Sequence, residues 1–382
     1  MKIIIPDNND SKLLDAVKRL TEKKSNHQIA EIYGKPTKSK HIGSGRANIF
    51  FDPLSKDEMI KRVEAFKKMG VDYEYSLNDI VPRARVLENR DEIIKELKWL
   101  EESPIKAASF ANYEMIKLAE KYCPNVNAVV SFYCNVDNVK KIRQFAKLKN
   151  VKVINTGVKT FRNIPLLKQL ADEAKKHDIK IRVIANLGCM ADCIRAEEHA
   201  IMKSFASIDT SVLHYAPCTF YCMKYHYENP EKFLRLPIIR PEDLRAYETI
   251  SIDSVKLVDR IQKTPWIEKV VGHYLDGFYK GNILDFTCTY TTLSIKKMSN
   301  KEVAEINMKE IIKSREGVLQ YREILPELMD VRIEKDYNLL GCNNDCGNCG
   351  GCKDISAVKY NPERRKIVLK QLEKLEKEYL FI

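Results

Sequence analysis

The chain has 382 residues, a net charge of +12 and 44% hydrophobic residues, a composition typical of a folded globular protein. No apolar run reaches the roughly 20 residues that a membrane helix needs, and the short apolar start MKIIIP is followed at once by polar residues, unlike a signal peptide. We therefore expect a cytoplasmic protein with no membrane partner. The excess of lysine and arginine suits an anionic partner such as RNA. The lysines are spread along helix faces with no Arg-rich stripe, however, which favours an ordinary Lys-rich surface.

Eight β-rich runs alternate with amphipathic stretches over the first 260 residues. One such stretch, residues 164–178, carries Ile164, Leu167, Leu170 and Ala174 on one helical face. Alternating strands and helices of this kind are the pattern of a parallel sheet with crossover helices. The expected strands cover residues 2–6, 28–34, 72–78, 105–112, 127–135, 151–157, 179–189 and 253–260.

Asparagine recurs where five of these strands end, which favours an α/β fold closed into a (β/α)8 TIM-type barrel. Strand ends of such a barrel ring the active-site mouth. The same residue type at a strand end is also common as a helix cap or a turn residue, so the pattern supports the barrel more than any catalytic role. The five residues are Asn78, Asn112, Asn135, Asn155 and Asn186.

Three segments fall outside the simple β/α units. Residues 35–55 form a Gly- and Ser-containing loop after the second strand, residues 189–250 form a long excursion before the last strand, and a Cys-rich extension follows the barrel. Its final helix is expected from Asn361-Pro362, a good N-cap and first-turn pair. We therefore predict a barrel domain over residues 1–320 and a C-terminal extension over residues 321–382.

Cysteine pairs within the excursion indicate a metal site. Cys189 and Cys193 are four residues apart, as are Cys218 and Cys222, so each pair shares a face if helical. Clustered cysteines in a reducing compartment more often bind metal than form disulfides. The two pairs together predict a [4Fe–4S] cluster, with zinc as the alternative.

A third group, GCNNDCGNCGGC, lies near the C-terminus. Its four cysteines are separated by glycine, asparagine and aspartate, which allow tight backbone wrapping. The spacing resembles a ferredoxin motif written in reverse and predicts a second [4Fe–4S] cluster, with zinc again as the alternative. The group consists of Cys342, Cys346, Cys349 and Cys352.

Several stretches together resemble the peptidase U32 family. They are IAEIYGK followed by GSGRANIFFDP, then GVDYEYSLND, the cysteine excursion, and LPIIRPEDLRAYETISIDSVKLVDR followed by VVGHYLDGFYKGN. The resemblance covers roughly residues 1–285 and implies a barrel with a [4Fe–4S] cluster, whose ligands carry over to Cys189, Cys193, Cys218 and Cys222. It also implies an enzyme, since better understood members hydroxylate ubiquinone precursors or RNA bases without O2, and others bear a collagenase-like protease description.

Polar groups near the strand ends supply the candidate catalytic residues: Glu31, Lys256, Asp259 and Arg260. An ion-pair network at the barrel end would account for the last three equally well, and a paired strand carboxylate for Glu31. The loop residue Arg46 is a candidate for cradling a carboxylate or phosphate. The candidate cofactor-binding residues are Arg46, Asn78 and Asn112.

Three functions remain open from the sequence. The first is an iron–sulfur enzyme for O2-independent, hydroxylation-type modification of RNA, a peptide or a small aromatic precursor, with an electron donor as a further partner. The second is a U32-type peptidase or other hydrolase, although neither His-Glu-x-x-His nor Gly-x-Ser-x-Gly occurs. The third is an electron-transfer scaffold.

Overall fold

The computed structural model describes most of the chain, with gaps in the loop after the second strand, in the excursion and around the tail cysteines. No helix in the described part of the chain is long and apolar enough to cross a membrane. The described residues are 1–35, 37, 39, 41–46, 53–80, 83–209, 217–287, 298–311, 315–333, 342–343, 348–349, 352 and 355–379.

Eight parallel strands close into a barrel in sequence order, with β8 pairing back onto β1, so the predicted (β/α)8 fold is confirmed. All eight predicted strands form, and several end earlier than expected because their last residues turn into the mouth loops. The strands are β1 (Lys2–Pro6), β2 (Gln28–Gly34), β3 (Asp72–Leu77), β4 (Ala107–Phe110), β5 (Asn127–Val130), β6 (Val151–Asn155), β7 (Lys180–Ile184) and β8 (Ser254–Lys256).

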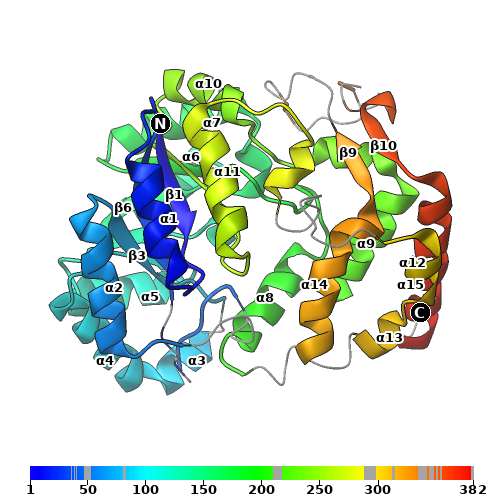
Figure 1. Cartoon of the computed structure of the whole chain (residues 1–382). Coiled ribbons are helices and arrows are strands. Elements are labelled where there is room, and N and C mark those ends of the chain that lie inside the picture. The colour runs from blue at the N-terminus through cyan, green and yellow to red at the C-terminus, as the bar shows by residue number, and fades with distance from the viewer. Residues whose placement is uncertain are drawn as a thin grey trace.

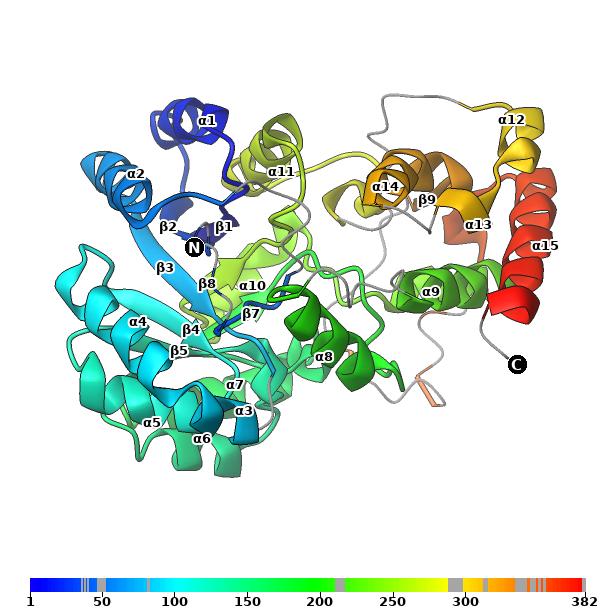
Figure 2. The ribbon, with the colours of Figure 1, turned by 90° about the horizontal axis from the view of Figure 1, so that it is seen from below.

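Helices cover the outside of the barrel (Figures 1 and 2). α7 illustrates the local cause: Asn163 caps it, Pro165 occupies its first turn, and Leu167, Leu170 and Ala174 are buried on the predicted face. The helices around the strands are α1 (Lys12–Thr21), α2 (Lys56–Lys68), α3 (Arg83–Glu88), α4 (Arg90–Glu102), α5 (Tyr113–Tyr122), α6 (Val139–Phe145), α7 (Ile164–Lys175), α10 (Leu244–Thr249) and α11 (Thr264–Asp276).

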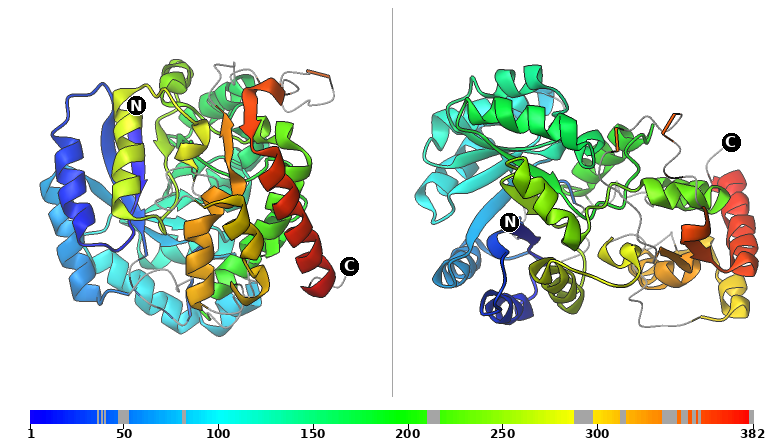
Figure 3. Two further views of the ribbon diagram at one scale, coloured as in Figure 1. Left: turned by 45° about the vertical axis from the view of Figure 1, so that its right-hand side comes forward. Right: turned by 90° about the horizontal axis from the view of Figure 1, so that it is seen from above.

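A second, mainly helical lobe lies beside the barrel and contains the C-terminus (Figures 1 and 3). The excursion contributes α9 to this lobe, where α9 packs on α15 through an ion pair between Lys224 and Glu376. The elements are α9 (Pro217–Glu228), α12 (Asn300–Glu305), α13 (Met308–Ile311), α14 (Arg315–Met329), β9 (Val331–Ile333), β10 (Val358–Tyr360) and α15 (Pro362–Tyr379).

The last helix begins at Pro362, as predicted from the Asn361-Pro362 pair. The predicted domain boundary at residue 320 falls inside α14, and that division of the chain stays a prediction.

Candidate functional site

A cluster of four charged side chains lies inside the barrel. Arg182 of β7 joins two carboxylates: its Nη2 lies 3.0 Å from Glu31 Oε1 of β2 and its Nη1 lies 2.5 Å from Glu74 Oε2 of β3. Lys256 Nζ of β8 donates to Glu74 Oε1 at 2.8 Å. Burial of charge is costly unless each charge is paired, and this cluster balances two carboxylates against two cations.

The two carboxyl groups of this cluster have opposite proton affinities. Burial raises the pKa of Glu31 to about 7, and the negative charge of Glu74 adds to the rise. Burial acts to raise the pKa of Glu74 as well, but the charges of Lys256 and Arg182 outweigh it and lower that pKa below its usual range. Divergent pKa values in neighbouring carboxyl groups are typical of acid–base sites, although ion-pair networks also produce them.

Tyr33 of β2 connects this cluster to a second charged layer nearer the barrel mouth. Its ring lies 3.6 Å from Lys256 Nζ, a cation–π contact. Burial raises the pKa of Tyr33, and the charges of Arg260 and Arg46 oppose the rise. Tyr33 therefore links the interior cluster to the mouth.

Two of the predicted residues, Arg46 and Arg260, meet at that mouth. Arg46 Nη2 pairs with Asp259 Oδ1 at 3.0 Å, and Arg260 Nη2 donates to Ser44 Oγ at 3.0 Å. Arg260 is only 3% exposed, and its Nη1 has no hydrogen-bond partner among the described residues. The mouth thus holds a buried guanidinium with unused hydrogen-bonding capacity.

The loop that carries Arg46 is fastened to the end of β3. Gly43 N donates to Asp79 Oδ2 at 2.9 Å, and Gly45 N donates to Asn78 Oδ1 at 3.1 Å. Lys35 lies beneath the same loop and donates to a backbone carbonyl in it; burial lowers the pKa of Lys35 to about 8. The side chain of the predicted site residue Asn78 therefore holds the loop in place by accepting from a backbone N–H of that loop.

Asn112 occupies the N-cap of α5, where its side chain accepts from Glu114 N at 2.9 Å. This is the capping role that an asparagine at a strand end commonly has. Its predicted part in cofactor binding stays a prediction.

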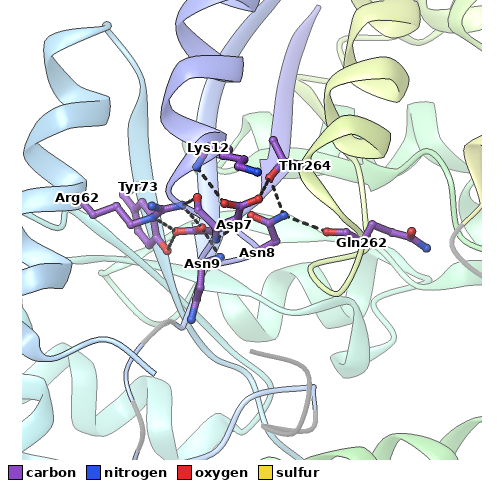
Figure 4. A network of polar contacts seen from close by, with 9 residues as sticks. Asp7, Asn8, Asn9, Lys12, Arg62, Tyr73, Gln262 and Thr264 are labelled. Atoms are coloured by element: carbon purple, nitrogen blue, oxygen red, sulfur yellow. Dashed lines mark hydrogen bonds and ion pairs between the residues drawn. The ribbon is translucent and has the colours of Figure 1, made fainter. Parts of the chain in front are cut away.

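A polar network beside the mouth anchors the end of β1 (Figure 4). Arg62 of α2 donates twice to the Asp7 carboxylate, at 2.9 and 2.7 Å, and Tyr73 Oη donates to it at 2.8 Å. Gly34 must lack a side chain here, because a Cβ would lie 2.7 Å from Tyr73 Oη and 2.9 Å from Asp7 Cβ. The network holds β1, β2 and β3 in register below the mouth loops.

The cysteine excursion begins just past β7. Cys189 packs against the core, and its nearby thiol adds to the burial that raises the pKa of Cys193. The second pair lies at the start of α9, and the two segments touch where the guanidinium of Arg195 lies 3.6 Å from the Tyr221 ring. The side chain of Cys218 lies outside the described residues, and those described assemble no group of three metal-binding side chains.

One tail cysteine contacts the excursion: Cys352 Sγ is 3.6 Å from the carbonyl oxygen of Leu234. Cys342 is partly buried. Cys349 is exposed, and Cys346 lies outside the described residues. The predicted second cluster therefore remains a prediction.

Sequence reasoning singled out Glu31 and Lys256 and missed Glu74 and Arg182. The available signal was a charged residue within an otherwise buried strand, in DYEYSL and KIRVI. Charged residues are almost never fully buried unless they are paired, so two such strands point to partners across the barrel.

Comparison with known proteins gives one relative that spans nearly the whole chain. The chain is 22% identical over 354 residues to "Uncharacterized protease MJ1657" of Methanocaldococcus jannaschii, covering 90% of this chain and 93% of the relative. No family model matches the chain.

Two solved structures illustrate the structural similarity. The U32 peptidase Mk0906 has a TM-score of 0.47 at 15% identity, over 67% of this chain and 90% of that one. A complex structure of a GH113 beta-1,4-mannanase has a TM-score of 0.36 at 11% identity, over 72% and 98% of the two chains.

Proposed function

From the peptidase U32 assignment, which the sequence motifs and the full-length relative support, we propose that this chain is an enzyme that modifies an anionic substrate at the carboxyl end of its barrel. The substrate classes are RNA, a peptide or a small aromatic precursor. The reaction is of the O2-independent hydroxylation type, and the cysteine excursion holds an iron–sulfur cluster.

The observation that carries the proposal is the buried guanidinium of Arg260. Its Nη1 has no hydrogen-bond partner among the described residues, and the charge of Arg46 adds to the burial that lowers the pKa of Arg260. Leaving a buried charged donor unsatisfied costs free energy, which a carboxylate or phosphate would recover. The mouth is therefore suited to an anion.

The residues around this position suggest how a substrate is held. Arg260 would donate to the anion, while Ser44 keeps its guanidinium oriented. Arg46 is 20% exposed and paired with Asp259, so it can approach an anion while Asp259 limits the excess positive charge. Tyr33 contacts Lys256 of the interior cluster, and the charges of Arg46 and Arg260 act on it, so Tyr33 would lie between the anion and the Glu31–Glu74 carboxyl pair.

The described cysteines fit part of a cluster site. Two observations support a shared site in the excursion: the electrostatic effect of Cys189 on Cys193, and the Arg195–Tyr221 contact beside Cys222. Cys189, Cys193, Cys218 and Cys222 would hold the cluster, which would bind or activate the oxygen donor or the substrate. The described residues alone do not complete this set, so no step is derived through the cluster.

Replacement of Arg260 with glutamine tests the anion site. We expect inorganic phosphate to raise the Tm of the wild type and to bind Arg260→Gln about 10–100-fold more weakly, since a charge-assisted hydrogen bond contributes roughly 1.5–3 kcal/mol. Isothermal titration at constant ionic strength measures the affinities.

Arg143→Gln is the control, because Arg143 pairs with Glu173 through an exposed side chain on α6, away from the mouth. Phosphate affinity should be unchanged in this variant. Equal phosphate affinity in wild type and Arg260→Gln would overturn the anion site.

Metal analysis tests the cofactor. After anaerobic purification we expect about eight irons per chain, falling to about four in Cys189→Ala/Cys193→Ala, because removing two ligands empties one [4Fe–4S] site. Iron, sulfide and zinc are assayed on both proteins. Zinc with little iron would contradict the redox reaction.

A peptidase or other hydrolase is the second candidate, favoured by the descriptions of the two relatives as a protease and a peptidase. It would use the same anion site for a peptide carboxylate. Cleavage of a peptide library by iron-free protein, lost in Arg260→Gln, would place this function first.

A further inference from the structure

Two carboxyl groups face each other inside the barrel, and their contacts differ. Both oxygens of Glu74 are engaged, one by Lys256 at 2.8 Å and one by Arg182 at 2.5 Å. Oε1 of Glu31 lies in an ion pair with Arg182 at 3.0 Å but accepts no hydrogen bond among the described residues. Glu74 is therefore held as a carboxylate, and Glu31 is not.

The two carboxyl groups share one guanidinium, because Arg182 pairs with both Glu31 and Glu74. Two carboxyl groups brought together in this way disfavour a second negative charge. Lys256 and Arg182 both favour the charged form of Glu74, so the proton resides on Glu31. Neighbouring carboxyl groups in enzymes share one proton in the same way.

We propose that Glu31 is the proton-exchanging group of the barrel and that Glu74 is its positioning residue, a fixed negative charge held by Arg182 and Lys256. Loss of the proton leaves two carboxylates facing two cations, so the deprotonated cluster is neutral, whereas the protonated cluster carries one excess positive charge. Arg182 and Lys256 therefore favour release of the proton, and burial of the Glu31 carboxyl group favours its uptake. The proposal rests on the function proposed above in one point only: the substrate lies on the mouth side of Tyr33.

The charged groups with the largest effects on Glu31 all belong to this cluster. β3 contributes Glu74, β7 contributes Arg182 and β8 contributes Lys256, while β1 places the apolar Ile4 opposite Glu31. Glu74 raises the pKa of Glu31, and Arg182 and Lys256 lower it. Removing a negative or a positive neighbour should therefore move the titration of Glu31 in opposite directions.

Infrared difference spectroscopy over a pH series tests the assignment on purified full-length protein without substrate. We expect a protonated-carboxyl band that persists to about pH 7 in the wild type and is lost in Glu31→Gln. The matched control is Asp79→Asn, because burial also raises the pKa of Asp79, at the mouth. That variant should keep the neutral-pH band of Glu31.

Two charge variants test the positioning role. In Glu74→Gln the midpoint of the band should fall by about one pH unit or more, and in Lys256→Gln it should rise. A purely structural role would not give shifts of opposite sign in two variants of one cluster. If either variant fails to fold by circular dichroism, the other still decides the sign.

Two results would overturn the proposal: a wild-type band that disappears below about pH 5, or a midpoint that moves in the wrong direction in a folded variant. The outcome is separate from that of the phosphate titration. If phosphate does not bind at the mouth, the carboxyl band is still expected. If the carboxyl band is absent, phosphate binding is still expected.

Discussion

Replacing Arg182 with methionine is expected to destabilise the protein by about 3–5 kcal/mol, the usual cost of removing one partner from a buried ion pair. The side chain of Arg182 is 4% exposed and bridges Glu31 and Glu74, so its loss leaves two carboxyl groups with Lys256 as their remaining cation. Urea-induced unfolding at pH 7 measures the change.

The control for this prediction is an exposed ion pair. Lys168 pairs with Asp172 one turn along α7, and both side chains are more than half exposed. Lys168→Met should change stability by no more than about 0.5 kcal/mol.

A double variant checks the cause of the destabilisation. Glu31→Gln/Arg182→Met should lose less stability than Arg182→Met alone, because one of the two carboxyl groups left without Arg182 has been removed. A loss below about 1 kcal/mol in Arg182→Met would contradict a tightly paired cluster.

The stability of the wild type relative to Glu31→Gln is expected to fall by about 3 kcal/mol as the pH rises from about 4.5 to about 7. The pKa of Glu31 is raised from an ordinary value of 4.5 to about 7 in the folded protein. Between these values the folded state holds a proton that the unfolded state has lost. Stability from this proton is therefore complete below the lower pKa and is lost as the pH rises through the upper one.

Paired unfolding curves of the wild type and Glu31→Gln at pH 4.5 and pH 8 measure this difference. Other titrating groups are common to both proteins, so they cancel in the comparison. A difference in stability that stays constant with pH would mean that the pKa of Glu31 is the same in the folded and the unfolded protein. A difference that grows with pH would mean that its pKa is lowered on folding.

Two of the four residues in the interior cluster were predicted from the sequence, and two were missed. Glu31 and Lys256 were chosen as polar groups in or near strand ends, and both lie in the interior cluster. Glu74 and Arg182 lie in equally well-predicted strands, yet nothing in their local sequence names their partners. Lys256 and Glu74 are 182 residues apart in the chain.

The sequence by itself determined the eight strands, the cysteine-bearing excursion and the final helix from Pro362. These features depend on local periodicity and on capping residues, which act over a few neighbouring residues. Tertiary structure alone decided which strand residues share a layer, because strand register in a closed barrel sets which side chains meet. The tertiary structure also brings Arg182 between two carboxyl groups and packs α9 on α15, outside the barrel wall.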